Sequence, residues 1–103
     1  MATLVYSRLA RRQLNQIQRY ITDASGHAEI GRDFANALRE HCRRISGLPG
    51  VSGRERDELG YGLRSIPHGA YLLIFRYSDN RMEIISVRHA ARDLALFDET
   101  APD

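Results

Sequence analysis

The residues best suited to chemistry gather in the C-terminal half of the chain, within or just after three short apolar segments. Arginine, histidine and tyrosine together could cleave RNA by attack of a 2′-hydroxyl, which needs a base for the hydroxyl and a cation for the charge on phosphorus. The same side chains could instead hold a carboxylate or phosphate, form structural ion pairs, or simply face water. They are Arg64, Tyr71, Arg76, Tyr77, Arg88, His89, Arg92 and Asp93.

The basic charge of the chain comes from arginine alone. The sequence has 15 Lys+Arg, all of them arginine, and 13 Asp+Glu, for a net charge of +2. Four of the acids lie in residues 93–103, so residues 1–92 carry 15 arginines against 9 acids, a net charge of +6. Arginine suits carboxylate and phosphate binding, although coding bias explains an all-arginine composition equally well. The missing lysine excludes a phosphate-loop lysine, a Schiff-base lysine and a lysine general base.

The sequence gives little support for a metal, cofactor or hydrolase site. His41 and Cys42 are adjacent, so on a helix they point about 100° apart, and no other His or Cys pair has zinc-ligand spacing. Gly60-Tyr61-Gly62 precedes a strand-like segment, whereas a phosphate loop opens a helix. No serine has a nucleophile-elbow context. We therefore expect no metal and no cofactor, and we expect Cys42 in the core.

The N-terminal half predicts a short strand and two helices that must position the C-terminal residues. Residues 2–6 predict the strand, and Ser7 is a suitable N-cap for the first helix. The second helix is expected from about His27 to Ile45, where glycine and proline follow. The first helix is indicated by apolar residues at helical spacing, Ala10, Leu14, Ile17 and Ile21.

The C-terminal half predicts an antiparallel meander. Residues 46–62 predict a loop, and the pattern then changes to strand periodicity with turn residues between the strands. The fold class is therefore α+β, with a helical hairpin on one face of an antiparallel sheet. The strands are expected at Leu63–Ile66, Tyr71–Tyr77 and Met82–His89, with turns at Pro67–Gly69 and Ser78–Asn80.

All elements are expected to form one domain over residues 1–103. No apolar run approaches the roughly 18 residues of a membrane helix, and no signal peptide is visible, so a cytoplasmic protein is expected. After Ala91 we expect one helical turn through Phe97 and an acidic, frayed tail from about residue 98.

The second predicted helix has more apolar surface than a one-sided helix needs. Its apolar positions cover nearly half of a helical wheel, against the roughly 100° that faces a core. A partner peptide that lies along the hairpin would cover the excess. These positions are Ile30, Phe34, Ala35, Ala37, Leu38, Cys42 and Ile45.

Four segments of the sequence carry a family pattern: Gly53–Leu59, Gly62–Pro67, Tyr71–Arg76 and Val87–Asp93. They resemble the pattern GRxRxEL…GLRSxP…YxIxYR…IxxVxHxxRD of the ParE toxins, within the RelE/ParE toxin–antitoxin superfamily. The first helix resembles the family segment SxxAxxDLxxIxxYI, with Gln13 where aspartate is usual. The resemblance implies a compact RelE-like fold and a toxin that a cognate antitoxin holds inactive.

The superfamily divides into ribosome-dependent messenger RNA endoribonucleases of the RelE type and ParE-type inhibitors of DNA gyrase. The ribonucleases typically carry further arginine or lysine at the end of the last strand and a tyrosine or histidine in the tail. This chain has no lysine, Ala90-Ala91 after His89, and Leu96-Phe97 in the tail. These departures favour a gyrase inhibitor that causes growth arrest by binding. If the chain is instead a ribonuclease, it would use Arg64, Tyr71 and His89. A third alternative, a plain adaptor domain, would leave these arginine, histidine and tyrosine side chains unexplained.

The residues and the resemblance together predict two binding surfaces. A ParD-like antitoxin is expected along the helical hairpin in a toxin–antitoxin hetero-oligomer, and DNA gyrase at the C-terminal end of the sheet. Direct contact with nucleic acid stays open. The antitoxin surface is predicted at Tyr20, Ile30, Phe34 and Leu38, and the target surface at Arg64, Arg88, His89, Arg92 and Asp93.

Overall fold

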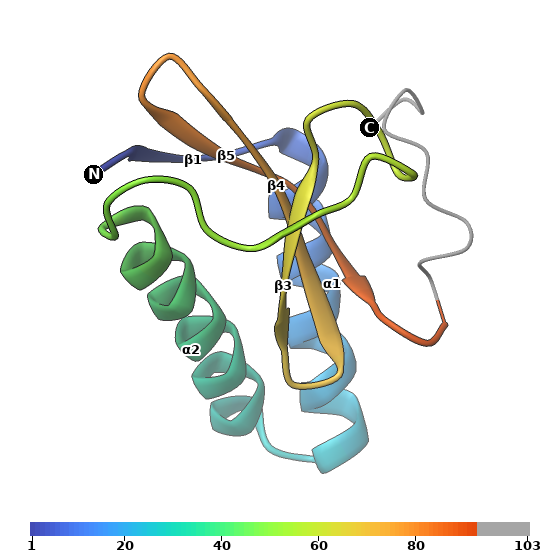
Figure 1. The fold of residues 1–103 in the computed structure, drawn as a ribbon. Helices are drawn as coiled ribbons and strands as arrows, with labels where there is room; N and C mark the ends of the chain where they lie inside the picture. The colour runs from blue at the N-terminus through green and yellow to red at the C-terminus, as the bar shows by residue number, and fades with distance from the viewer. Residues whose placement is uncertain (93–103) are drawn as a thin grey trace.

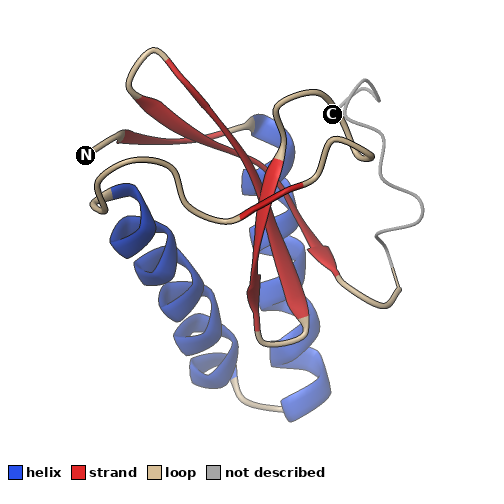
Figure 2. Cartoon of the chain, viewed as in Figure 1, coloured by secondary structure: helices blue, strands red, loops and turns tan. Residues whose placement is uncertain are grey.

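A helical hairpin packs against a twisted five-stranded sheet (Figures 1 and 2). The computed structural model describes residues 1–92. The predicted α+β class and the order strand, two helices, then a meander are confirmed. The elements are β1 (Thr3–Tyr6), α1 (Arg8–Ser25), α2 (Ala28–Ser46), β2 (Arg54–Glu55), β3 (Arg64–His68), β4 (Tyr71–Ser78) and β5 (Arg81–His89).

The sheet is mixed, which corrects the expectation of a purely antiparallel sheet. Its strand order is β1-β5-β4-β3-β2, and β1 pairs in parallel with β5 over residues 81–84. The two-residue strand β2 pairs antiparallel with Arg64 and Ser65, within a segment that we had expected to be a loop. The pairing of β1 with β5 joins residues far apart in sequence, so the local pattern gave no sign of it. Strand β2 has only two residues, too few to show strand alternation.

The first helix, α1, begins and ends at residues with clear capping roles. The side chain of Ser7 accepts a hydrogen bond from the Ala10 amide and caps α1, as predicted. At the other end Gly26 has φ +76°, the left-handed conformation that glycine adopts without strain, and its N–H bonds the Thr22 carbonyl. The short connection that follows reverses the chain into α2, so the helices lie antiparallel (Figure 1).

The sheet has an apolar cluster on each face. The larger cluster, between the hairpin and the sheet, includes Leu14, Leu38 and Phe75. The smaller one joins Leu63 to Leu72 and Ile74 and has Leu59 packed against it. The loop between α2 and β3 crosses this second face (Figure 2). A short chain thus buries both faces of its central strand, β4.

The turns are shorter than the sequence predicted. Pro67 and His68 belong to β3, and the chain turns at Gly69 and Ala70. Because β2 pairs only with Arg64 and Ser65, Pro67 lies where the outer edge of β3 is open and a missing N–H breaks no ladder bond. The next turn falls at Asp79 and Asn80, whose φ angles are +48° and +63°. Aspartate and asparagine tolerate that conformation better than most residues.

Three predictions fall on residues 93–103, which lie outside the described part of the chain. They are the role of Asp93, the helical turn through Phe97 and the frayed tail from about residue 98. Within residues 1–92, neither helix is both long and apolar enough to cross a membrane.

Gly31 allows the two helices to approach closely, and its substitution tests the packing. A Cβ atom at this position would lie 2.6 Å from the backbone carbonyl oxygen of Gln18 on α1. Alanine normally stabilises a helix interior by about 1 kcal/mol relative to glycine. We nevertheless expect Gly31→Ala to lower the free energy of unfolding by about 1–3 kcal/mol, the usual cost of overpacking.

Urea denaturation of the purified chain measures this change. Asn36→Ala, at an exposed position of the same helix, is the control and should change the stability by less than about 0.5 kcal/mol. A Gly31→Ala protein as stable as the control would show that the hairpin can separate without loss.

Candidate functional site

A bulge in β5 lies at the centre of the candidate site. Ile74 pairs with Ser86 and Phe75 with Ile84, so Ile85 between them has no partner on β4. Ser7 Oγ donates a hydrogen bond of 2.7 Å to the carbonyl oxygen of Ile85. A bulge leaves backbone groups outside the ladder, and here the residue that caps α1 satisfies one of them.

Gln13 on α1 satisfies the groups that follow the bulge. Its side-chain oxygen accepts hydrogen bonds from the Val87 amide at 2.7 Å and from Ser86 Oγ at 3.0 Å. Gln13 is only 9% exposed, so water cannot easily replace these bonds. Arg88 extends the network, since its Nε donates to Ser86 Oγ at 2.9 Å. One amide oxygen therefore ties α1 to the C-terminal half of β5.

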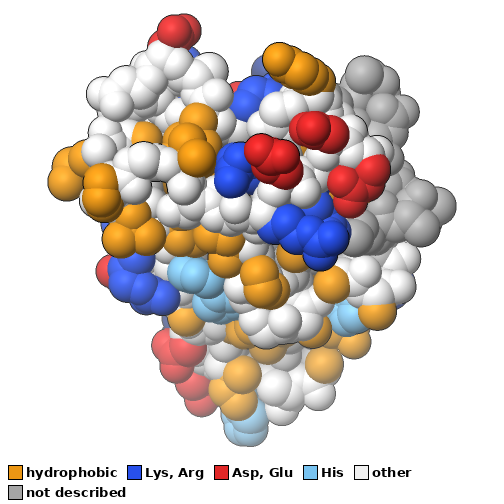
Figure 3. All heavy atoms as spheres, viewed as in Figure 1, with side chains coloured by type: hydrophobic (Ala, Val, Ile, Leu, Met, Phe, Trp, Pro, Cys, Tyr) orange, Lys and Arg blue, Asp and Glu red, His pale blue; other side chains and the backbone are white. Residues whose placement is uncertain are grey.

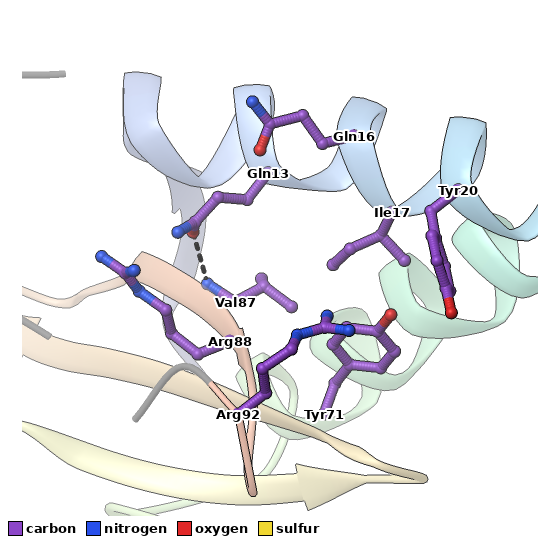
Figure 4. Close-up of a pocket in the computed structure, with 8 residues that line it drawn as sticks. All are labelled: Gln13, Gln16, Ile17, Tyr20, Tyr71, Val87, Arg88 and Arg92. Carbon is purple, nitrogen blue, oxygen red and sulfur yellow. Dashed lines mark hydrogen bonds between the residues drawn. The ribbon is translucent and has the colours of Figure 1, made fainter. Parts of the chain in front are cut away.

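A pocket of about 380 Å³ opens beside this network, between α1 and the end of β5 (Figure 4). Gln13, Gln16, Ile17 and Tyr20 line it from one face of α1, at the i, i+3, i+4 and i+7 spacing of that face. Tyr71, Val87, Arg88 and Arg92 complete the lining from the sheet and the residues after it.

The two arginines of the pocket point toward its opposite ends. Figure 4 shows Arg88 directed toward the Gln13 end and Arg92 toward the Tyr20 end. The guanidinium carbon of Arg92 lies 5.8 Å from the centroid of the Tyr20 ring, within cation–π range. The Arg92 amide donates to His89 Nδ1 at 3.2 Å, which holds the end of β5 in a turn. The pocket therefore combines an apolar floor with two cationic groups, a lining suited to an acidic or phosphate-bearing ligand.

Tyr71 and His89 lie together, as the ribonuclease alternative requires. They pair across β4 and β5, and their rings meet edge to face at 5.5 Å. Phe34 of α2 packs against the same Tyr71 ring at 5.6 Å. Tyr71 is therefore buried between a helix and a neighbouring strand.

The structure does not bring Arg64 to these residues. His68, at the far end of β3, is the residue that pairs with Tyr71. Arg64 lies four residues earlier, about 13 Å away at the rise of a strand. Its Nε and one terminal nitrogen donate to the carbonyls of Ser52 and Gly53, and Glu55 lies 3.7 Å from the other nitrogen. Arg64 thus fastens the loop before β3.

The other polar strand residues, Arg76 and Tyr77, hold the loop before β3, and Tyr77 does so from the hairpin side of the sheet, where it packs against the larger cluster. Arg76 donates to the carbonyl of Tyr61, and the Tyr77 hydroxyl accepts from the Ser52 amide. Figure 3 shows basic and acidic side chains mixed over this part of the surface. The charged stretch of the loop includes the pair Arg56–Glu58. Because positively and negatively charged side chains are mixed there, this surface does not present a patch of one charge that would attract a charged partner.

The predicted antitoxin residues divide into exposed and buried positions. Tyr20 is 57% exposed and Ile30 is 45% exposed, while Phe34 is half-buried against Tyr71 and His68. Leu38 is fully buried in the main core, which corrects its placement on a partner surface. The wide apolar face of α2 is explained mostly by the core, because Ala35, Leu38, Cys42 and Ile45 all face it.

Sequence reasoning missed Gln13, Gln16 and Ser86 as members of the site. Gln13 gave a signal, because it interrupts the family pattern and shares a helix face with Ala10 and Ile17. The role of Ser86 depends on the bulge, which the sequence does not mark. Cys42 is buried as expected, and burial raises the pKa of its thiol, so it is unreactive.

The fold and pocket thus define a small α+β protein with a basic, tyrosine-lined cavity at one edge of its sheet. A family model described as "ParE toxin of type II toxin-antitoxin system, parDE" matches residues 4–94, so the chain belongs to this family. The resemblance found in its motifs is therefore confirmed. Among solved structures, it is similar to a chain of the "Chromosomal ParDE TA system from P. aeruginosa", with a TM-score of 0.76 and 18% identity. That match covers 86% of this chain and 96% of the other, and at this identity it supports the fold alone. No curated protein sequence matches this chain.

Substituting Gln13 tests whether its amide oxygen holds the site together. Gln13→Leu keeps a side chain of similar size but leaves the Val87 amide and the Ser86 hydroxyl without their acceptor. Since an unsatisfied buried polar group costs about 1–3 kcal/mol, we expect the free energy of unfolding to fall by at least that amount. Hydrogen exchange should quicken at the Val87 amide.

Gln16→Ala is the matched control, because Gln16 lines the same pocket from an exposed position. It should leave both the stability and the Val87 exchange rate almost unchanged. Equal behaviour of the two variants would contradict the role given to Gln13.

Proposed function

We propose that this ParE toxin arrests growth by binding DNA gyrase and thereby blocking replication, and that a ParD-like antitoxin neutralises it in a toxin–antitoxin hetero-oligomer. The proposal places its action in the cytoplasm, where gyrase works. The observation that carries it is the pocket between α1 and β5, where Arg88 lies toward Gln13 and Arg92 lies beside Tyr20.

The arrangement of the described residues favours binding over catalysis. Cleavage by 2′-hydroxyl attack needs a base and a cation close to one phosphate. Tyr71 and His89 are in contact, but Arg64 lies about 13 Å away along the sheet and is bonded to loop carbonyls. Arg88 and Arg92 are instead placed to hold an acidic or phosphate group, and no proton transfer is required for that.

The same pocket explains how an antitoxin could neutralise the toxin. Tyr20 belongs both to the pocket and to the exposed side of the hairpin, where Ile30 is also accessible. A peptide that covers Tyr20 would lie over Arg92, because the guanidinium rests on the Tyr20 ring. Neutralisation would then be direct occlusion of the target surface. The family description and the ParDE title of the similar structure support a partner of this kind.

Growth arrest tests the target surface. We expect Arg92→Ala and Arg88→Ala to reduce toxicity when the chain is expressed without antitoxin. Arg81→Ala should remain fully toxic, because Arg81 is exposed at the opposite end of the same strand. Induced cells should lose DNA supercoiling and replication before they lose messenger RNA. Full toxicity of both pocket variants would remove the pocket from the proposal. Transcripts cut on the ribosome, with activity lost in His89→Ala, would establish the ribonuclease instead.

Binding of the cognate antitoxin tests the second surface. Burying an apolar side chain is worth about 1.5–3 kcal/mol, so Tyr20→Ala and Ile30→Ala should each raise the Kd roughly 10- to 150-fold. Both positions are exposed, so the variants should fold normally. Tyr61→Ala is the control, since Tyr61 is 91% exposed in the loop before β3. Isothermal titration calorimetry with wild-type antitoxin gives the Kd of each of the three variants for comparison with the wild type. An unchanged Kd for Tyr20→Ala would exclude occlusion at the pocket.

A further inference from the structure

Two histidines that lie 27 positions apart in the chain meet where α2 packs against the end of β3. His41 comes from the C-terminal half of α2, and His68 is the last residue of β3. Their Nδ1 atoms are 2.9 Å apart, and their ring centroids are 5.1 Å apart. Both side chains are half-buried, and neither belongs to the pocket beside α1.

The two facing nitrogens allow two kinds of chemistry. One ring can donate Nδ1–H to the other, or both rings can turn lone pairs toward a cation. Burial lowers the pKa of His41 and of His68, and the mutual approach of the rings and nearby Arg44 act in the same direction on His41. Both imidazoles are therefore mainly neutral at pH 7, and neutral imidazole is the form that binds metals.

The distance between the nitrogens selects among metals. A metal–imidazole bond is about 2.0–2.1 Å, so one ion bonded to two nitrogens 2.9 Å apart subtends an angle of roughly 90°. That is the cis angle of the tetragonal geometry preferred by Cu(II) and Ni(II), whereas tetrahedral zinc needs nitrogens about 3.4 Å apart. We propose that His41 and His68 chelate a divalent copper or nickel ion across the interface between α2 and β3, with water as the remaining ligands.

The surroundings of the pair set the strength of the site. Residues 1–92 contain no group of three or more His, Cys, Asp or Glu placed to hold a metal, so the chain supplies two ligands. The Phe34 ring packs edge-on against His68 at 5.6 Å and fixes the orientation of that imidazole. Arg44 opposes a cation, but its position on α2 is exposed, so solvent screens its charge. The site is therefore weaker than a four-ligand structural zinc site.

Metal binding at this place would stabilise the folded chain. The two histidines are close only after α2 has packed on the sheet, so an ion that binds both of them binds the folded state alone. It would also secure α2 next to Phe34, one of the residues predicted to contact the antitoxin. The inference does not depend on the proposed function, because it is tested without a growth assay and without antitoxin.

Thermal unfolding of the purified chain, without a histidine tag, provides the first test. Added CuCl₂ or NiCl₂ should raise the Tm of the wild type as its concentration increases, and the rise should be lost in His41→Asn and in His68→Asn. His27→Asn is the matched control, since His27 is an exposed histidine at the other end of α2. Arg44→Gln should bind the metal more tightly than the wild type. The same Tm shift in His41→Asn as in the wild type overturns the proposal.

A second measurement on the wild type decides the question if either histidine variant fails to fold. Paramagnetic Cu(II) at substoichiometric concentration should broaden the imidazole NMR signals of His41 and His68 first. Broadening that begins at His27 or His89, or no selective broadening at all, overturns the proposal and leaves an N–H···N hydrogen bond as the role of the pair.

Discussion

The hydrogen bonds accepted by the Gln13 side-chain oxygen are the constraint on which the site depends. The bulge at Ile85 turns backbone and side-chain groups of β5 away from β4, and β1 pairs only as far as Ile84. Beyond that point α1 takes the place of a neighbouring strand. Ser7 supplies the donor and Gln13 the acceptor that a strand would have supplied. Because these bonds are buried, α1 is held at one distance and rotation relative to β5, and the pocket between them acquires a defined shape.

The choice of glutamine has an electrostatic consequence. The ParE pattern usually has aspartate at this position, and an aspartate would carry a negative charge into a network that reaches Arg88 through Ser86. Glutamine accepts the same two hydrogen bonds without that charge. Glutamine therefore adds no negative charge to the network that reaches Arg88. The neutral amide also makes the α1–β5 contact insensitive to pH near neutrality, because glutamine does not titrate.

The sequence predicted the elements well and their long-range contacts poorly, for physical reasons. Periodic apolar residues and the Ser7 cap depend on local geometry, so both helices and four of the five strands in the described residues were predicted. Two contacts depend instead on how distant segments pack: the parallel pairing of β1 with β5, and the contact of His41 with His68. The periodicity of residues within one segment does not encode such contacts. Arg64 shows the limit most clearly. It stands in the family motif Gly62–Pro67, yet strand register places it one β3 length away from Tyr71.

In this small chain α1 both packs against the sheet and lines the pocket. Only some substitutions can therefore affect one of these roles without the other. Gln13 and Ile17 line the pocket, but both are buried and also join α1 to the sheet, so a change at either position alters the folded state before it alters binding. Gln16 and Tyr20 occupy the exposed border of the same face and carry little of the core. On the opposite wall, Tyr71 is buried, whereas Arg92 lies at the surface. Substitutions at Gln16, Tyr20 and Arg92 therefore change the lining of the pocket while its shape stays fixed by Gln13, Ile17 and Tyr71.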